Sequence, residues 1–472
     1  MRWRSSERPA FAAAPPPRAV LPVARSFPFV LCALFLIVLW IAGGASRGEV
    51  PGQTVVRGAA WICLCLGVLF ARRPAFGDAW PVALFLGLAL ALALVQLVPL
   101  PPAVWQALPG RALLAEAAGI AGEAQPWRPM SIVPDATRNA AGSLIVPIAM
   151  LLVMAAMRET ERSWLPGMLL GLIVASTLLA LLQFSGSRFN NPLINDTVGQ
   201  ISASFANRNH LALFLAIGCA LAPTWVFLNG HGAPWRMLVA IGMVLLFVLM
   251  ILATGSRAGL LLGGLALLAA ATLVWNDLRR QMRRYPRWVL PAIGVGAGAV
   301  IAIAVLLAFS ANRAMSLNRI LAEGAGEDMR SRALPTVLNM ISTYFPAGSG
   351  LGGFDPIFRI HEPMALLKLT FFNHAHNDLL EVVLDAGLPG MLLLLLALGW
   401  WAIAAVRAWR EGPDAMLARL GAVILGLVLV ASAFDYPART PMIMGVIVIA
   451  AWWLTGSPLR QGAALRTSGK HL

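Results

Sequence analysis

The sequence predicts an all-α integral membrane protein with about twelve transmembrane helices and both termini in the cytoplasm. Of its 472 residues, 59% are hydrophobic and 12% are charged, whereas a soluble domain carries about 25% charged residues. Apolar runs close to the ~20 residues that cross a bilayer recur from one end of the chain to the other. Lys and Arg gather in alternate connections between these runs, as they do in cytoplasmic loops.

Each predicted span is an apolar run bounded by polar, Pro or Gly residues. Some of the runs are short enough to be tilted pairs or re-entrant segments instead of full spans. All four cysteines lie within the runs, so we expect them to pack as small apolar residues and to form no disulfide framework. In order, the predicted spans are residues 27–43, 57–71, 79–99, 141–157, 165–184, 210–228, 237–254, 259–275, 289–309, 389–406, 419–434 and 441–455.

The basic residues set the predicted orientation. Of the 36 Lys and Arg residues, 21 lie in the segments assigned to the cytoplasm, and residues 276–288 alone hold five arginines. The net charge of +15 therefore comes mainly from basic residues that set the orientation of the spans. A nucleic-acid surface would instead need arginines and aromatic residues together on a soluble face. The Arg-rich start followed by an apolar run also resembles a signal peptide. Its length and the many later spans favour an uncleaved first helix.

The predicted organisation has five parts. A cytoplasmic tail covers residues 1–26, and a second one covers residues 456–472. Residues 27–309 contain the first nine spans, with a Pro-rich outer loop at 100–140. Residues 310–388 form a larger outer loop, and residues 389–455 contain the last three spans. No nucleic-acid partner is expected, and the bilayer is the predicted environment.

The loop at 310–388 is long enough to indicate a function, since most connections in such a protein are tight. Part of it has helical periodicity, with apolar side chains at spacings of three and four. We therefore expect a short amphipathic helix that lies on the membrane surface or against the helix bundle. The residues predicted to form its apolar face are Leu334, Val337, Leu338, Ile341 and Tyr344.

The stretch FFNHAHNDLLEVVLDAGLPG, residues 371–390, ends this loop. Asp378 and Glu381 have the D-x-x-E spacing of a helix capping box. Gly387 stands where a left-handed residue can end a helix. These three residues thus have a structural interpretation.

The two histidines of the same stretch, His374 and His376, leave three interpretations open. His374, His376 and Asp378 imitate the H-x-H-x-D run of binuclear metal sites, but Leu379 stands where such sites have another His. A neutral His on the outer side can also take a proton from a hydroxyl near pH 7. The third interpretation is a loop histidine that is hydrogen-bonded for structural reasons.

Three arginines stand at the outer edges of predicted spans: Arg208 in SASFANRNHLALF, Arg257 in ATGSRAGLL and Arg330 in EDMRSRALP. Arginine binds phosphate with two parallel hydrogen bonds, so these residues are candidates for binding a lipid phosphate. The alternative is snorkelling to the interface. Asn207 and Asn209 flank Arg208 and make its surroundings polar.

The ordered series FANRNHLALFLA, TGSRAGLLLG, Arg330 followed by LNMISTYFPAGSGLGGF, and HAHNDLLEVVLDAGLPG resembles the O-antigen ligase and O-antigen polymerase superfamily of bacterial membrane glycosyltransferases. The resemblance covers about residues 185–405. It implies about twelve spans in the inner membrane, with a large periplasmic loop between the ninth and tenth helices. It also implies metal-independent, inverting transfer of a glycan from a polyprenyl diphosphate carrier to an acceptor hydroxyl, with no cofactor.

By motif position, the resemblance assigns Arg208, Arg257 and Arg330 to the donor diphosphate. It assigns acceptor activation, as the catalytic residue, to His376. One departure from the family pattern is Leu334, which stands where a Trp is usual. The residues in supporting positions are His374, Asn377, Asn207 and Asn209.

Two questions stay open from the sequence. A chain with this many spans is also typical of a transporter or exporter of a polysaccharide or small anion, although transporters usually carry ionisable groups near the middle of spans. Here the charges gather at the helix ends, which favours the transferase. The acceptor, whether a glycan, lipid A core or a protein, is not decided, because the shared motifs concern the donor.

Overall fold

The computed structural model describes residues 25–187, 189–195, 199–228, 234–283, scattered positions between 286 and 302, 329–367, 372–412 and 415–456. Within these residues the chain is almost entirely α-helical. Its only sheet there is an antiparallel pair of two-residue strands, β1 (Pro99–Leu100) and β2 (Arg128–Pro129). The predicted all-α fold class is therefore confirmed.

Eight helical segments of the described chain are long and apolar enough to cross a membrane. They are α2 (Pro51–Phe70), η1 with α3 (Gly77–Ala79 and Trp80–Val95), α6 with α7 (Pro134–Ser143 and Ile145–Ala156), α8 with α9 (Glu159–Arg162 and Leu165–Phe184), α10 (Arg208–Phe227), α11 (Pro234–Thr254), α12 (Arg257–Met282) and α17 (Asp378–Arg410). Three shorter apolar helices accompany them: α1 (Phe27–Ala42), α18 (Met416–Ser432) and α19 (Pro441–Thr455).

Each of these helices coincides with one predicted span, because long apolar runs between polar turns leave few alternatives to a helix. Most of the predicted span at 289–309 lies outside the described residues, as do residues 310–328 and nearly all of both tails. The four cysteines lie in α1, α2 and α10 as free thiols.

Helix α10 is the centre of the bundle. It packs against α9, α11, α12 and α18, and 15 of its 20 residues are buried. A helix that is apolar on every side is typical of such a central position. Small residues let its neighbours approach closely: a Cβ added to Gly259 would lie 2.5 Å from the Cβ of Ala212. The start of α10 is therefore fixed in place by the helices around it.

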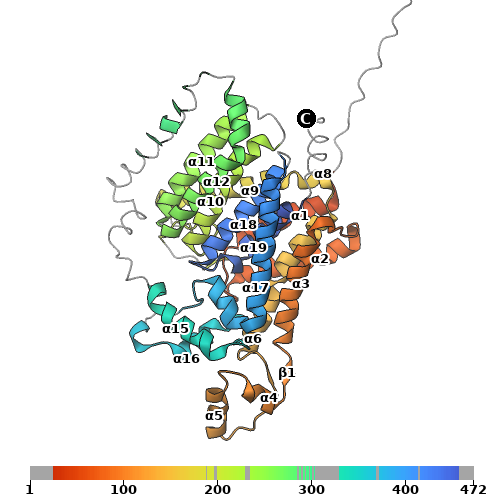
Figure 1. Ribbon diagram of the computed structural model, residues 1–472, viewed down its shortest axis with the longest axis vertical. Helices are drawn as coiled ribbons and strands as arrows, with labels where there is room; N and C mark the ends of the chain where they lie inside the picture. The colour runs from red at the N-terminus through yellow and green to blue at the C-terminus, as the bar shows by residue number, and fades with distance from the viewer. Residues whose placement is uncertain are drawn as a thin grey trace, which may run out of the picture.

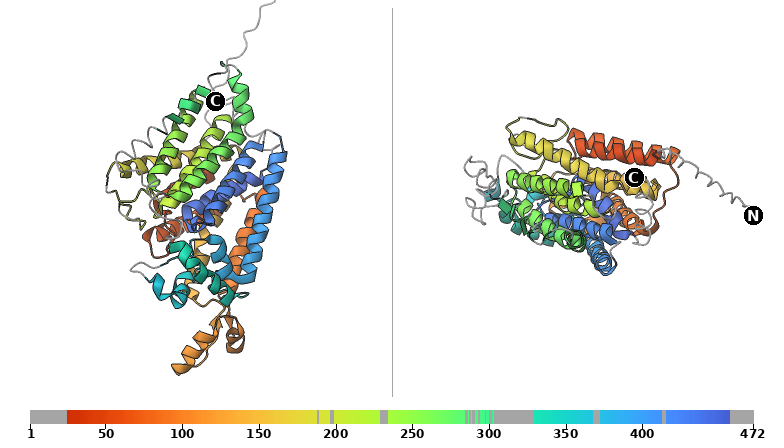
Figure 2. Two further views of the ribbon diagram at one scale, coloured as in Figure 1. Left: turned by 60° about the vertical axis from the view of Figure 1, so that its left-hand side comes forward. Right: turned by 90° about the horizontal axis from the view of Figure 1, so that it is seen from above.

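A second layer covers one end of the bundle, at the lower end of Figure 1. It contains α4 (Pro102–Ala107), α5 (Ala112–Ile120), α15 (Met329–Tyr344), α16 (Phe354–His361) and η2 (Met364–Leu366). This layer has its own small core, which includes Tyr344, Phe354, Phe358 and Leu384. In Figure 1 and Figure 2, α4 and α5 lie farthest from the bundle.

Helix α15 confirms that the loop contains a helix but corrects the predicted apolar face. The buried residues are Ala333, Val337, Met340 and Tyr344. Leu334 and Leu338, which were assigned to that face, are 42% and 49% exposed. The cause is tertiary packing: α15 contacts α16 and α17, and the contact follows the row of residues 333, 337, 340 and 344, which also lie three and four apart.

Candidate active site at one end of the bundle

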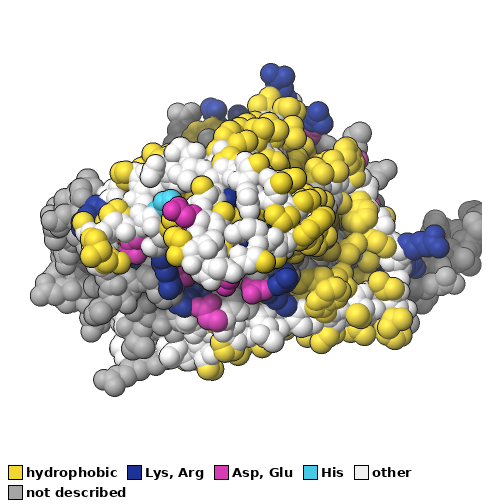
Figure 3. All heavy atoms as spheres, turned by 90° about the horizontal axis from the view of Figure 1, so that it is seen from below, with side chains coloured by type: hydrophobic (Ala, Val, Ile, Leu, Met, Phe, Trp, Pro, Cys, Tyr) yellow, Lys and Arg dark blue, Asp and Glu magenta, His cyan; other side chains and the backbone are white. Residues whose placement is uncertain are grey.

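The starts of α10, α12 and α17 meet the connection between α18 and α19, residues 433–440, which includes η4 (Pro437–Arg439). The meeting point lies between the bundle and the second layer. Figure 3 views the molecule from this end and shows basic, acidic and histidine side chains among apolar ones. Helix N-termini favour negatively charged groups, so three of them at one place suit an anion.

The central feature is a hydrogen bond from His376 to Asp435. His376 Nδ1 lies 3.2 Å from Asp435 Oδ1, and the two side chains are 17% and 4% exposed. The other carboxylate oxygen, Oδ2, accepts hydrogen bonds from Asn207 Nδ2 at 2.9 Å and from Asn209 Nδ2 at 2.6 Å. Both predicted supporting asparagines of α10 therefore bind Asp435.

Asp435 is a buried carboxylate that stays ionised. Burial alone would raise its pKa, but the hydrogen bond from His376 and the charge of Arg330 hold that pKa well below its ordinary value. An ionised carboxylate against an imidazole nitrogen fixes which nitrogen carries the proton. His376 consequently has Nδ1 protonated, and Nε2 is the ring nitrogen that can accept a proton.

The backbone around His376 is held in an unusual shape. His376 has φ of +51°, in the left-handed region that residues other than Gly rarely occupy. The next residue, Asn377, caps α17 by accepting from Leu380 N at 3.0 Å, and its Nδ2 donates to Ala433 O at 3.1 Å. Such strain is concentrated at functional sites, where the surroundings impose it. Here Asn377 ties the strained residue to the loop that carries Asp435.

Arg330 reaches the same place from α15 in the second layer. Its Nη1 donates to Phe434 O at 2.9 Å, and its Nη2 lies 3.6 Å from Asp435 Oδ2. Its side chain is 33% exposed. The structure thus brings two predicted site residues, His376 and Arg330, to one carboxylate.

Arg208 and Arg257 are the first residues of α10 and α12. The two helix starts are joined by Ser256, whose Oγ donates to Asn209 Oδ1 at 2.8 Å and accepts from Gly259 N at 2.9 Å. Arg208 Nη1 is buried and has no hydrogen-bond partner among the described residues. A buried donor of this kind usually signals a missing ligand or water. The side chains of Arg208 and Arg257 are partly buried.

His374 belongs to a second network, beside the first. Its Nδ1 donates to Glu381 Oε1 at 2.9 Å. Arg439 lies among three buried carboxylates: Nε is 3.0 Å from Asp378 Oδ1, Nη1 is 3.1 Å from Glu381 Oε1, and Nη2 is 3.8 Å from Asp385 Oδ2. Burial disfavours the charge of Arg439, but these carboxylates raise its pKa above the ordinary value. Arg439 is therefore the cation that holds α17 to the loop.

This network corrects the capping interpretation of the sequence. The N-cap of α17 is Asn377, and Asp378 is the first helical residue. Asp378 and Glu381 do not cap α17: both bind Arg439, and they accept from Ala438 N and Ala375 N, which lie outside the helix. The expectation for Gly387 is confirmed: its φ is +57°, and it interrupts α17.

Tyr436 connects the two networks. Its ring centroid lies 4.3 Å from that of His374, 5.0 Å from that of His376 and 5.2 Å from that of His210. Burial raises the pKa of Tyr436 to about 12, so its hydroxyl stays protonated. Asn373 Nδ2 donates to that hydroxyl at 3.4 Å. Tyr436 thus fixes the spacing between the histidine rings.

Sequence reasoning missed Asp435, Tyr436 and Arg439. They lie in FDYPART, residues 434–440, which looks like an ordinary turn between two apolar runs. The sequence did contain a signal, because the short connection between two apolar runs holds an acid, an aromatic residue and an arginine. Among the described residues, no group of three or more His, Cys, Asp or Glu side chains is placed to hold a metal ion.

These features define a multi-pass membrane protein with a His–Asp pair and arginines at one end of its helix bundle. Residues 241–395 match the family model described as O-antigen ligase. This match agrees with the resemblance to the O-antigen ligase and O-antigen polymerase superfamily that the motifs indicated. The match includes Arg257, Arg330 and His376, and it ends before Asp435. No curated protein matches the chain significantly.

Proposed function

We propose that this protein transfers a glycan from a polyprenyl diphosphate carrier to an acceptor hydroxyl at the periplasmic face of the bacterial inner membrane, as an O-antigen ligase or a surface polysaccharide polymerase. The observation that carries the proposal is the His376–Asp435 pair next to Arg330, at the point where α10, α12 and α17 begin. The family match supports this general activity. The donor, the mechanism and the metal independence are part of the proposal.

His376 acts as the general base. Its Nδ1–H donates to Asp435, so Nε2 can accept the proton of the acceptor hydroxyl. The hydroxyl oxygen then attacks the anomeric carbon of the donor sugar, and the bond from that carbon to the diphosphate oxygen breaks. The electron pair leaves with the diphosphate. Attack opposite the leaving group inverts the anomeric centre, and Asp435 stabilises the imidazolium.

The arginines bind the donor diphosphate and stabilise the charge that develops on it. The energy for transfer comes with the substrate, because the glycan is already activated by the diphosphate. Arg208 is the best placed to accept a ligand, since its Nη1 is buried without a hydrogen-bond partner among the described residues. Each charge-assisted contact contributes about 1.5–3 kcal/mol, and contacts that strengthen as the diphosphate leaves accelerate the reaction.

Glycan analysis of a deletion strain tests the function and identifies the acceptor. Finished polymer that stays on the carrier indicates a ligase, and single repeat units indicate a polymerase. Loss of glycan from proteins indicates a transferase to serine or threonine. An unchanged glycan profile, or substrate trapped on the cytoplasmic side, contradicts transfer and supports the transporter interpretation.

Replacing Arg208 with alanine is expected to lower kcat/KM for the lipid-linked donor about 10- to 100-fold, which is the value of one charge-assisted contact. Arg208→Lys keeps the charge and should recover only part of the loss, because lysine cannot bind phosphate with two parallel hydrogen bonds. The control is Arg236→Ala, which changes an arginine that lies over Trp225 and Trp235. Equal kcat/KM values for the Arg208 and Arg236 variants would exclude a donor contact.

Chelation is expected to leave transfer intact. Among the residues that the structure describes, no three His, Cys, Asp or Glu side chains are grouped so as to hold a metal ion. Purified protein in liposomes should therefore turn over at the same rate with and without EDTA. A loss of activity that zinc or manganese restores would move the assignment to a metal enzyme.

A further inference from the structure

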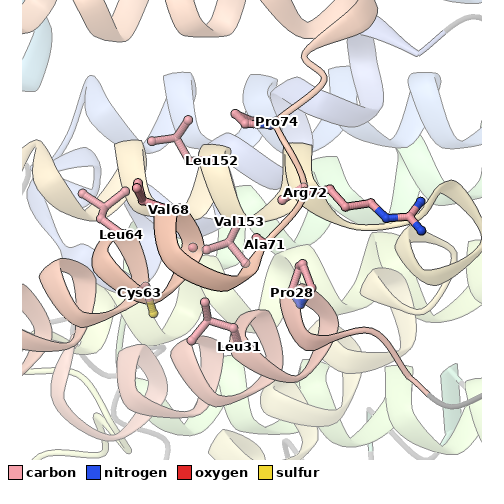
Figure 4. Close-up of a pocket in the computed structure, with 12 residues that line it drawn as sticks. Pro28, Leu31, Cys63, Leu64, Val68, Ala71, Arg72, Pro74, Leu152 and Val153 are labelled. Atoms are coloured by element: carbon pink, nitrogen blue, oxygen red, sulfur yellow. The ribbon is translucent and has the colours of Figure 1, made fainter.

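The far end of the bundle contains an apolar hollow that the reaction does not use. It lies between α1, α2 and α7 and encloses about 80 Å³. Leu31, Cys63, Val68 and Val153 are among the side chains that line it (Figure 4). These residues lie near the start of α1 and the ends of α2 and α7, whereas the His–Asp pair lies by the opposite helix ends. The hollow is thus separate from the candidate active site.

One wall of the hollow is left open by glycine. Gly67 lines it, and a Cβ added to Gly67 would have no neighbouring atom within 4 Å. The surface beside it is apolar and exposed: Val68 is 85% exposed and Phe70 is 67% exposed. On a membrane protein, exposed large apolar side chains of this kind face lipid chains. The hollow therefore opens toward hydrocarbon.

A basic residue stands at the rim. Arg72 lines the hollow just after α2 ends and is followed by Arg73. In Figure 4 the guanidinium of Arg72 lies outermost, away from the apolar side chains. An apolar slot with a cation at its mouth matches a phospholipid, which has a hydrocarbon chain and a phosphate at a short distance from it.

We propose that this hollow holds a short segment of one acyl chain of an anionic phospholipid of the leaflet at that end, and that Arg72 binds the phosphate of the same lipid. The charge of Arg72 favours an anionic over a zwitterionic headgroup, because a cation at the rim adds attraction to a negative lipid. The lipid fills the space between α1, α2 and α7 that no described side chain occupies. This site does not depend on the reaction proposed above.

A pair of glycine variants on one helix tests the acyl-chain part. Gly67→Leu adds a side chain at the wall of the hollow without a backbone clash, and Gly58→Leu makes the same change at an exposed position that also has no neighbour within 4 Å. Each purified protein is analysed for retained phospholipid by mass spectrometry. Thermal unfolding is then measured with and without added phosphatidylglycerol.

Wild type and the Gly58→Leu variant are expected to keep the lipid and to be stabilised by phosphatidylglycerol. The Gly67→Leu variant should retain at most about one fifth as much lipid as wild type. It should also lose the stabilisation by phosphatidylglycerol, since a ligand stabilises only the protein that binds it. Equal lipid content and equal stabilisation in the two glycine variants would overturn the proposal.

A pair of arginine variants tests the headgroup part and does not require the Gly67 variant to fold. Arg72→Ala should remove the preference for phosphatidylglycerol over phosphatidylethanolamine, whereas Arg73→Ala should keep it, because Arg73 does not line the hollow. Equal preferences in the Arg72 and Arg73 variants would overturn the assignment of the phosphate to Arg72.

Discussion

Asp435→Asn is expected to lower the rate of glycan transfer by about 10²- to 10⁴-fold while the protein still folds and inserts. The amide is close in size to the carboxylate, so the contacts of Oδ2 with Asn207 and Asn209 change little in shape. An amide NH₂ facing His376 Nδ1 favours the tautomer with Nε2 protonated, which cannot accept a proton. In serine proteases the same exchange of the partner carboxylate costs about 10⁴-fold.

The measurement is the turnover of purified protein in liposomes with a lipid-linked glycan donor. The control is Asp135→Asn, which removes a carboxylate that is 91% exposed and pairs with Arg138. This variant should match wild type, since exposed ion pairs contribute little. A turnover for Asp435→Asn within a factor of a few of wild type would show that the pair has no catalytic role.

Arg439→Met is expected to destabilise the protein by about 3–5 kcal/mol, because it leaves buried carboxylates without their cation. Arg439 is the shared partner of Asp378, Glu381 and Asp385, all of which are buried. The loop at 433–440 would lose its attachment to α17, so transfer should fall together with stability. Arg439→Lys keeps one positive charge, so its stability should lie between that of wild type and that of Arg439→Met.

Thermal unfolding in detergent, followed by the loss of monodisperse protein, measures this effect. Arg359→Met is the matched control, because Arg359 forms a bidentate but exposed pair with Asp355. Its expected cost is at most about 1 kcal/mol. If both variants unfold at the same temperature, the cluster around Arg439 does not hold the loop in place.

The sequence predicted the membrane helices well because each span is an apolar run of the required length. Helices α9 and α19 have the predicted bounds, and α1 differs by one residue. The buried face of α15 could not be predicted from the sequence, because Val337 and Tyr344 can share a helix face with either Leu334 or Ala333. The contact of α15 with α16 and α17 decides that Ala333 is the buried one.

The candidate site was partly predictable for a similar reason. His376 and the arginines stand out as polar residues at the ends of apolar runs. Asp435 does not, because its partner His376 is 59 residues away and no local pattern joins them. Arg439 was missed for the same cause. Asp378 and Glu381 were interpreted as a capping box because Arg439, which binds them, lies far away in the sequence.

The central claim is that His376 accepts the proton of the acceptor hydroxyl, and His376→Ala tests it most directly. Purified variant protein with normal membrane insertion is assayed for transfer from the lipid-linked donor, with and without added imidazole. Loss of transfer by about 10²-fold or more, partly restored by imidazole, is the predicted result for a missing general base. Transfer at close to the wild-type rate without imidazole would contradict the assignment.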